Sequence, residues 1–202
     1  RAPIGGYMAA SAEHSGAYLS VFAHFPGLKV VVPSTPYDAK GLLIAAIRDP
    51  NPVLFFEHKM LYRTRGHVPP EPYEIPLGQA TVRRTGSDVT LVATAYMVTL
   101  ALQASEQLAA RGVEVEVIDL RTAEPLDMAA ILESVRRTGR AVIVDEDHRK
   151  HGLGAEIGMQ IVEGCWGALK APVGRVGAAD VPIPYAPVLE RAVLPSVEQI
   201  VK

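Results

Sequence analysis

The alternation of hydrophobic and polar positions is clearest over residues 27–59, where it predicts one strand, one helix and a second strand. The β-branched run at 29–32 ends at a proline, as a strand does. Thr35, with Pro36 after it, has the composition of a helix start, and apolar residues recur at helical spacing over 39–47. The continuous apolar run at 53–56 is typical of a buried parallel strand. The pattern therefore predicts a right-handed βαβ crossover.

The remainder of the chain repeats this alternation of strands and helices. A short amphipathic helix is predicted over 17–24. Further strands are predicted over 89–94, 113–120, 141–144 and 173–176, and helices over 97–111, 127–138, 153–169 and 197–202. The strand at 113–120 alternates polar and apolar residues, so we expect it to be half-exposed. Such an order of elements indicates an α/β fold with mostly parallel sheets.

The distribution of proline divides the chain into two α/β units. Prolines at 69, 70, 72 and 76 favour an extended connection, so we expect a first unit at 1–64, a linker at 65–80 and a second unit at 81–202. The first unit has too little predicted sheet to cover both faces of a parallel βαβ unit. Either upstream sequence is missing or another chain completes the sheet, and we favour a missing upstream portion.

Composition excludes several classes of function. The net charge is −2 and no basic run exceeds two residues, which argues against a nucleic-acid surface. No apolar run approaches the roughly 20 residues of a membrane-spanning helix. The single cysteine, Cys165, lies among apolar neighbours and is expected in the core, and one cysteine without a partner fits a reducing compartment.

Three groups of residues could be taken for functional sites, but their sequence context does not favour this. His148 and His151 follow three acids, but no second ligand group is evident, so a solvated loop after a strand is expected. The glycines at 152, 154 and 158 resemble a nucleotide-binding loop, but their spacing is GxGxxxG. The arginine pairs at 83–84 and 136–137 are expected to be solvated.

The C-terminus of the helix that ends near residue 48 is a candidate cation site. The last carbonyls of a helix are unpaired, and Asp49 and Asn51 add side-chain oxygens in a turn made rigid by two prolines. An all-oxygen cluster suits a hard cation. The alternative is a helix stop with a solvated aspartate.

Taken together, seven separated segments resemble one family. They are RAPIGG near the start, EHS at 13–15, FAHFPGLKVVVPSTPYDAKGLL at 22–43, AIRDPNPVLFFEHKMLY at 46–62, VIDLRTAEPLD at 117–127, GLGAEI at 152–157 and DVPIPYAPVLERAVLPSVE at 180–198. The chain resembles the beta subunit of the decarboxylating component of 2-oxo acid dehydrogenase complexes, in the transketolase-like superfamily. The resemblance implies the C-terminal half of a pyrimidine-binding domain at 1–64 and a complete C-terminal domain at 81–202.

This resemblance also implies an activity, cofactors and partners. The family uses thiamine diphosphate and magnesium, shared with an alpha subunit, to decarboxylate a 2-oxo acid oxidatively and to pass the acyl group to a lipoyl arm. Implied partners are the alpha subunit, in a heterotetramer of two alpha and two beta chains, a second beta subunit, and the acyltransferase core with its lipoyl domain. The implied location is the bacterial cytoplasm or, in a eukaryote, the mitochondrial matrix.

Two sites can be carried over from the family residue by residue. His14 matches the histidine of the family's HSQ motif near the reactive carbon and is the catalytic candidate, although Gly16 stands in place of the glutamine. Ala46 and Ile47, through their carbonyls, together with Asp49 and Asn51, match a structural potassium site. The cofactor-activating glutamate is expected upstream of Arg1, so the isolated fragment is expected to be inactive and to associate through an uncovered apolar edge.

Two other functions remain as alternatives. One is a non-catalytic assembly or docking module of the same complex. The other is a nucleotide-binding α/β domain that uses the glycines at 152–158.

Overall fold

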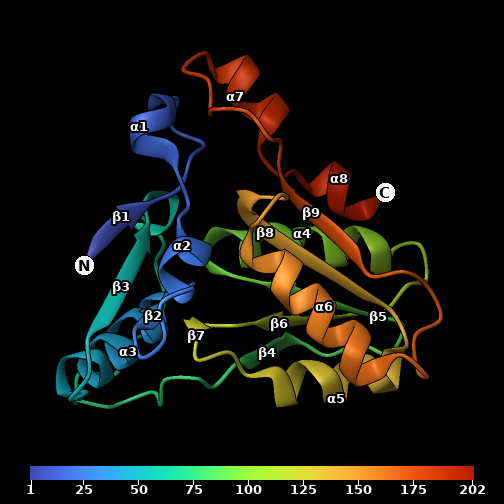
Figure 1. Ribbon diagram of the computed structural model, residues 1–202, viewed down its shortest axis with the longest axis horizontal. Helices are drawn as coiled ribbons and strands as arrows, with labels where there is room; N and C mark the ends of the chain where they lie inside the picture. Colours follow the sequence, from blue (N-terminus) through green and yellow to red (C-terminus); the bar gives the residue numbers. More distant parts are fainter.

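The computed structural model describes residues 1–202, which form two sheets with helices on both faces (Figure 1). The first sheet has the order β1 (Ala2–Ile4), β3 (Val53–His58), β2 (Lys29–Val31) and β7 (Thr122–Glu124). The second has the order β4 (Thr81–Arg84), β6 (Val115–Asp119), β5 (Val89–Ala93), β8 (Ala141–His148) and β9 (Gly174–Ala178). Pairing is parallel except for β7 on β2 and β4 on β6, so the prediction of mostly parallel sheets is confirmed.

Eight α-helices and one short 3₁₀ turn complete the fold. They are α1 (Ser11–Ser15), α2 (Leu19–Ala23), α3 (Pro36–Arg48), η1 (Lys59–Leu61), α4 (Ala95–Ala109), α5 (Met128–Thr138), α6 (Leu153–Cys165), α7 (Pro187–Val193) and α8 (Val197–Val201). The predicted start of α3 is confirmed in detail, since the Thr35 hydroxyl accepts a hydrogen bond from the Asp38 amide at 3.1 Å.

Successive residues of each central strand face different helix layers. In β5, Leu91 packs with residues of α4 and α8, whereas Val92 packs with residues of α5 and α6. In β2, Val31 packs against α3, and Val30 points to the second sheet's core. This alternation is what the period of two along a strand requires.

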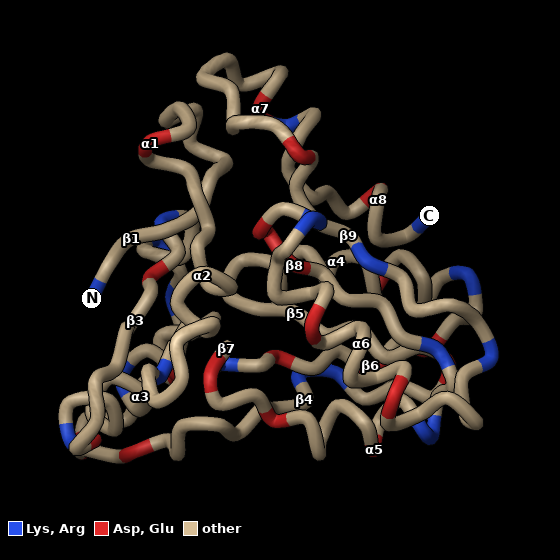
Figure 2. The backbone as a smooth tube through the Cα atoms, viewed as in Figure 1, with Lys and Arg blue, Asp and Glu red and all other residues tan.

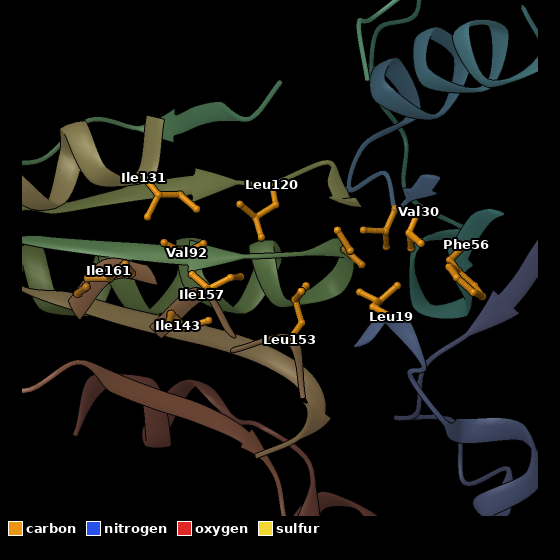
Figure 3. Packing of buried hydrophobic residues seen from close by; sticks show 14 of the residues in the cluster. Leu19, Val30, Phe56, Val92, Leu120, Ile131, Ile143, Leu153, Ile157 and Ile161 are labelled. Atoms are coloured by element: carbon orange, nitrogen blue, oxygen red, sulfur yellow. The ribbon is translucent and has the colours of Figure 1, made fainter. Parts of the chain in front are cut away.

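The two units share one continuous core. Leu19, Val30 and Phe56 of the first unit belong to the same buried cluster as Val92 and Leu120 of the second (Figure 3). Strand β7 crosses the predicted boundary as well, because it comes from the second unit and pairs antiparallel with β2. The two units are therefore joined by both a shared sheet and shared apolar packing.

The proline-rich segment at 65–80 forms no helix or strand, but it does more than connect the units. Ile75 is buried against α3, and its amide donates to the Gly41 carbonyl at 3.2 Å. A Cβ added at Gly41 would lie 2.7 Å from Ile75 Cγ1, so the segment packs directly on the helix backbone.

Two expectations about exposure are wrong. Strand β6 is buried along its whole length, because it lies between β4 and β5 and is covered on both faces. Its two acids are both paired, Glu116 with Arg137 and Asp119 with Arg83. The acids at 145–147 do not form a solvated loop. Strand β8 continues through them to His148, and all three are buried.

Arg83 is also not a solvated charge. Its guanidinium is paired with the buried carboxylate of Asp38, and its Nε and Nη2 donate to Asp119 Oδ2 at 3.0 and 2.7 Å. Arg121 Nη2 lies 2.8 Å from the other oxygen of Asp38, and the Ser34 hydroxyl donates to Asp119. Asp38 belongs to α3 of the first unit, so this ion network ties the two units together at their buried boundary.

Asp145 meets the first turn of α6. Its Oδ2 accepts from the Gly154 amide at 3.1 Å and its Oδ1 from the Asp147 amide at 3.2 Å. Burial, assisted by the negative charge of Asp147, raises the pKa of Asp145 to about 7.

Charges elsewhere are mixed in sign. Basic and acidic segments are interspersed along the whole backbone (Figure 2). No helix in the structure combines the length and the apolar character needed to cross a membrane.

Replacing Arg83 by methionine should destabilise the fold strongly, because Asp119 would lose its cation and Asp38 would retain only Arg121. Breaking a buried ion pair from one side costs about 3–5 kcal/mol. Urea denaturation should show this loss for Arg83→Met, whereas Arg111→Met, at an exposed turn position, should stay within about 0.5 kcal/mol of the parent. Equal stability of the two variants would contradict the role given to the network.

Asp145→Asn should change the pH dependence of stability. The pKa of Asp145 is about 7 in the native state. In the unfolded chain it has the ordinary aspartate pKa of about 3.9. Its contribution to stability is therefore complete below that lower value and is lost as the pH rises to about 7. Relative to the variant, the parent should lose free energy of unfolding in this window, by at most about 1.4 kcal/mol per pH unit.

Urea denaturation at several pH values measures this difference. Asp180→Asn, at an exposed position, is the control and should follow the parent curve. Parallel curves for the parent and Asp145→Asn would show that Asp145 is ionised in the native state throughout.

Candidate functional site

His14 lies in α1 and is exposed to solvent at a groove of about 480 Å³. The other residues that line this groove are Pro3, Met8, Ala10, Glu13, Gly16, Tyr18 and Lys59. Lys59 binds the backbone of α1, because its ammonium donates a hydrogen bond to the His14 carbonyl. The structure thus places the predicted catalytic imidazole where a flexible substrate could reach it.

The segment that carries α1 starts at the carboxyl end of β1. Gly5 has a φ of +92°, and a Cβ at this position would lie 2.1 Å from His58 Nε2, so only glycine fits. The Gly5 amide donates to the Gly16 carbonyl at 3.2 Å, which closes the base of the loop.

Gly16, which stands where the family's motif has glutamine, lies under the ring of Tyr18. A Cβ at Gly16 would lie 2.1 Å from Cζ of the Tyr18 ring, so the ring lies directly over this glycine. A larger residue at 16 would require the Tyr18 side chain, which lines the same groove, to move.

Beneath the loop lies a buried histidine–glutamate pair that sequence reasoning missed. His58 Nε2 and Glu146 Oε2 are 2.6 Å apart, with the two side chains 1% and 5% exposed. The Nδ1 atom of His58 accepts from the Met60 amide at 3.2 Å, so Nε2 carries the proton and donates to Glu146. Glu146 Oε1 accepts a second hydrogen bond, from the Gly6 amide at 2.6 Å. No spacing in the sequence relates these residues, because they come from different units.

Aromatic and cationic side chains surround this pair. Tyr96 stacks on the His58 ring at 5.3 Å, and Tyr7 meets Tyr96 edge-on at 5.1 Å. Burial raises the pKa of Tyr7, and its hydroxyl donates to the Pro195 carbonyl at 2.8 Å. Tyr7 of the loop thus contacts groups of the second unit.

Burial lowers the pKa of Lys59, although the charges of Glu146 and Glu190 oppose this shift.

The residues predicted to hold potassium lie together at the end of α3. Two carbonyls are left for a cation, because Pro50 has no N–H for Ala46, and the Asn51 amide donates to Asp49 Oδ1 at 2.9 Å instead of to Ile47. The Asp49 carboxylate is already engaged. The Lys29 ammonium donates to it and lowers its pKa, and Asn51 Nδ2 donates to Oδ1 at 3.0 Å. Two carbonyl oxygens are therefore available as ligands, whereas the carboxylate is occupied by the Lys29 ammonium.

A second groove, of about 410 Å³, lies at the carboxyl ends of β2 and β3, where α/β proteins commonly bind ligands. Its lining does not fit a magnesium diphosphate group. Both cations in its lining are already engaged. Lys40 donates to the carbonyls of Pro70 and Glu71 at 3.0 and 2.9 Å and also to that of Pro69, and Arg1 is paired with Glu57. No group of three or more His, Cys, Asp or Glu side chains in the chain is arranged to hold a metal ion.

The glycines at 152 and 154, which a nucleotide-binding loop would need, instead allow close packing. A Cβ at Gly152 would lie 2.2 Å from the His148 carbonyl oxygen, and one at Gly154 would lie 3.2 Å from Ile143 Cγ2. The carboxylate of Asp145 occupies the start of α6, where a phosphate would have to bind. Cys165 is buried, as predicted, with its Sγ 3.6 Å from the Leu132 carbonyl.

Comparison with known proteins agrees with the geometry. Residues 1–65 match the transketolase pyrimidine-binding domain, and residues 78–200 match the transketolase C-terminal domain. Among solved structures, a split-gene transketolase is similar, in an inactive tetramer of four beta chains. Its TM-score is 0.77, and it is 26% identical over 99% of this chain and 63% of that one.

Several characterised relatives are beta subunits. The beta subunit of acetoin:2,6-dichlorophenolindophenol oxidoreductase from Cupriavidus necator is 48% identical over 99% of this chain and 59% of its own length. The 2-oxoisovalerate dehydrogenase subunit beta of Bacillus subtilis is 47% identical over 95% and 59%. The pyruvate dehydrogenase E1 component subunit beta of Rhizobium meliloti is 44% identical over 100% and 44%.

The chain thus spans about half the length of the curated relatives that it matches. Its two sheets, their mostly parallel order and the two domain matches agree with one another. The chain belongs to the transketolase family, and it is similar to the beta subunits of an acetoin oxidoreductase and of pyruvate and 2-oxoisovalerate dehydrogenases.

Proposed function

We propose that the chain acts as part of the beta subunit of a thiamine-diphosphate-dependent 2-oxo acid dehydrogenase, and that His14 serves the transfer of the acyl group to a lipoyl arm. The observation that carries this proposal is the position of His14, exposed at an open groove and held by its backbone, in a chain 44% and 47% identical to beta subunits of pyruvate and 2-oxoisovalerate dehydrogenases.

The chain's own contribution is to hold and move protons at the mouth of the site. An imidazole can serve as a general acid, so His14 can donate a proton to the thiolate that departs when the lipoyl disulfide opens. The backbone contact from Lys59 leaves the His14 ring free for this task. Thiamine diphosphate, when bound with magnesium, supplies the carbon–carbon cleavage chemistry.

The partners follow from the same proposal. An alpha subunit, in an assembly of two alpha and two beta chains, completes the cofactor site, and a second beta subunit and the acyltransferase core with its lipoyl domain complete the complex. Exposed apolar side chains support such contacts; they are Met8 and Tyr18 in the lining of the groove, Tyr185 just before α7, and Val188 and Leu189 on α7. We place the complex in the bacterial cytoplasm or the mitochondrial matrix, as some relatives are bacterial and others are named mitochondrial.

The second candidate is an assembly or docking module without a catalytic role. The exposed side chains of Val188 and Leu189 on α7 favour it, because neighbouring apolar residues left exposed on a helix are typical of an interaction site. The two candidates differ in what a change at His14 does.

In the full-length assembled enzyme, His14→Ala should spare carbon dioxide release to an artificial oxidant and reduce transfer to the lipoyl arm. Losing a positioned acid typically costs about 10²–10⁴-fold. Stability should change little, because the ring is exposed. The two rates are measured side by side, with His24→Ala, an exposed histidine outside the groove, as the control.

Equal loss in both assays would place His14 in an earlier step. An unchanged transfer rate would favour the docking module.

We propose in addition that potassium binds at the end of α3, through the Ala46 and Ile47 carbonyls with Asp49 and Asn51, in place of the Lys29 ammonium. Binding to the native state alone should raise the melting temperature as potassium increases. Sodium at equal ionic strength should raise it less. Asp49→Ala should remove the difference between the salts, and Lys29→Met should enlarge it, because the competing cation is gone.

Melting curves in the two salts test this site without any activity assay. Identical responses of the parent, Asp49→Ala and Lys29→Met would reject it.

A further inference from the structure

The loop before His14 has a backbone conformation that ordinary side chains avoid. Tyr7, Ala9 and Ser11 have φ values of 67°, 52° and 65°, in the left-handed region that favours glycine. Such a conformation persists only where its surroundings hold it in place. Because the loop leads directly into α1, the groups that hold it also set the position of the His14 ring.

Two buried carboxylates of the second unit hold this loop. The Gly6 amide donates to Glu146 Oε1 at 2.6 Å, and the Ala9 amide donates to Glu190 Oε2 at 2.9 Å. Hydrogen bonds to an ionised acceptor are about twice as strong as neutral ones. The first bond fixes Gly6, next to the strained Tyr7, and the second fixes Ala9, which is itself strained. The residues joined are 140 and 181 positions apart in the sequence.

The two carboxylates differ in what else they do. Glu146 also accepts from His58, so removing it would break a buried pair as well as the loop contact. Glu190 is 2% exposed, and its side chain contacts no other hydrogen-bond donor: its second oxygen, Oε1, is buried without a partner. The side chain of Glu190 therefore has the loop as its one polar partner.

Glu190 comes from α7, which lies beside the loop. In Figure 1, α1 and α7 project together from the same edge of the molecule. A Cβ at Gly6 would lie 2.6 Å from Leu194 Cδ1, so the end of α7 packs directly on the loop backbone. The helix does not need the Glu190 side chain for its own hydrogen bonds, because the Glu190 amide donates to Ala186 and its carbonyl accepts from Leu194.

We infer that Glu190 is a positioning residue for His14: its carboxylate, supplied by the C-terminal domain, holds the loop of residues 5–11 in the conformation that presents the imidazole to the groove. The inference rests on the proposed function of His14 for its effect on the reaction, but the contact between Glu190 and the loop can be tested without it.

The test uses the full-length assembled enzyme with Glu190→Ala and Glu190→Gln. Glutamine keeps a carbonyl oxygen that can accept from the Ala9 amide, whereas alanine removes it. Glu163→Gln, at an exposed position on α6, is the matched control. Amide hydrogen exchange is followed in peptides that cover the loop and α1 and, for comparison, β5 and β6, because local opening raises exchange only where contacts are lost.

With alanine, exchange should rise in the loop and α1 and stay unchanged in β5 and β6. The kcat for lipoyl acylation should fall by about 10- to 100-fold, since a displacement of 1 Å can cost about 10²-fold. The KM for the 2-oxo acid should stay within about threefold, because the loop contact positions a catalyst and does not bind that substrate. Glutamine should restore most of the rate and most of the protection, and the control variant should match the parent.

Unchanged exchange in the loop of Glu190→Ala would overturn the inference, as would an equal rise across β5 and β6 or a failure of glutamine to restore the rate. A local rise in exchange with no loss of transfer would also overturn it if His14→Ala does lose transfer. If neither variant loses transfer, the loop contact stands and the proposed function of His14 fails.

Discussion

The partly buried guanidinium of Arg83 between the carboxylates of Asp38 and Asp119 is the contact on which the arrangement of the two units depends. Both carboxylates are fully buried, so each requires a cation or several donors close by. Asp38 lies in the first turn of α3, where Thr35 also bonds to it, and Asp119 ends the central strand β6. The start of a helix in one unit is thereby fixed against the sheet of the other.

A second polar contact between the units lies beneath the loop that carries His14. There Glu146 accepts from His58 and Gly6, and Glu190 accepts from Ala9. Between the two polar contacts the boundary is apolar and is formed in part by Leu19 and Leu153 (Figure 3). Hydrophobic packing stabilises this boundary but is not directional. The ionic and hydrogen-bonded groups have specific geometry, so they fix the orientation of one unit relative to the other.

This arrangement gives the second unit a role at the site although it contributes no residue to the lining of the groove around His14. The strained φ values of the loop are compensated by acceptors from β8 and α7. Local strain held by a distant element is a feature of functional sites, because it fixes a side chain more narrowly than an unstrained loop would.

The sequence by itself determined the elements whose signals are local. Thr35 and Pro36 begin α3, prolines at 50 and 52 end it, and the apolar runs give β2 and β3. Cys165 in the core and the mostly parallel sheets were equally predictable, because both follow from periodicity and the order of elements. The family resemblance selected His14, which the structure places at an open groove.

Only the tertiary structure decided the rest. Strands β1, β4 and β7 have three or four residues, too few for a periodic pattern. Arg83 and Glu146 read as solvated charges because nothing near them in sequence explains their burial. Arg83 pairs with Asp38, 45 positions away, and Glu146 accepts from Gly6, 140 positions away; Asp38 and Gly6 both belong to the other unit. A charged residue can be buried only with such a partner, and folding alone brings the two together.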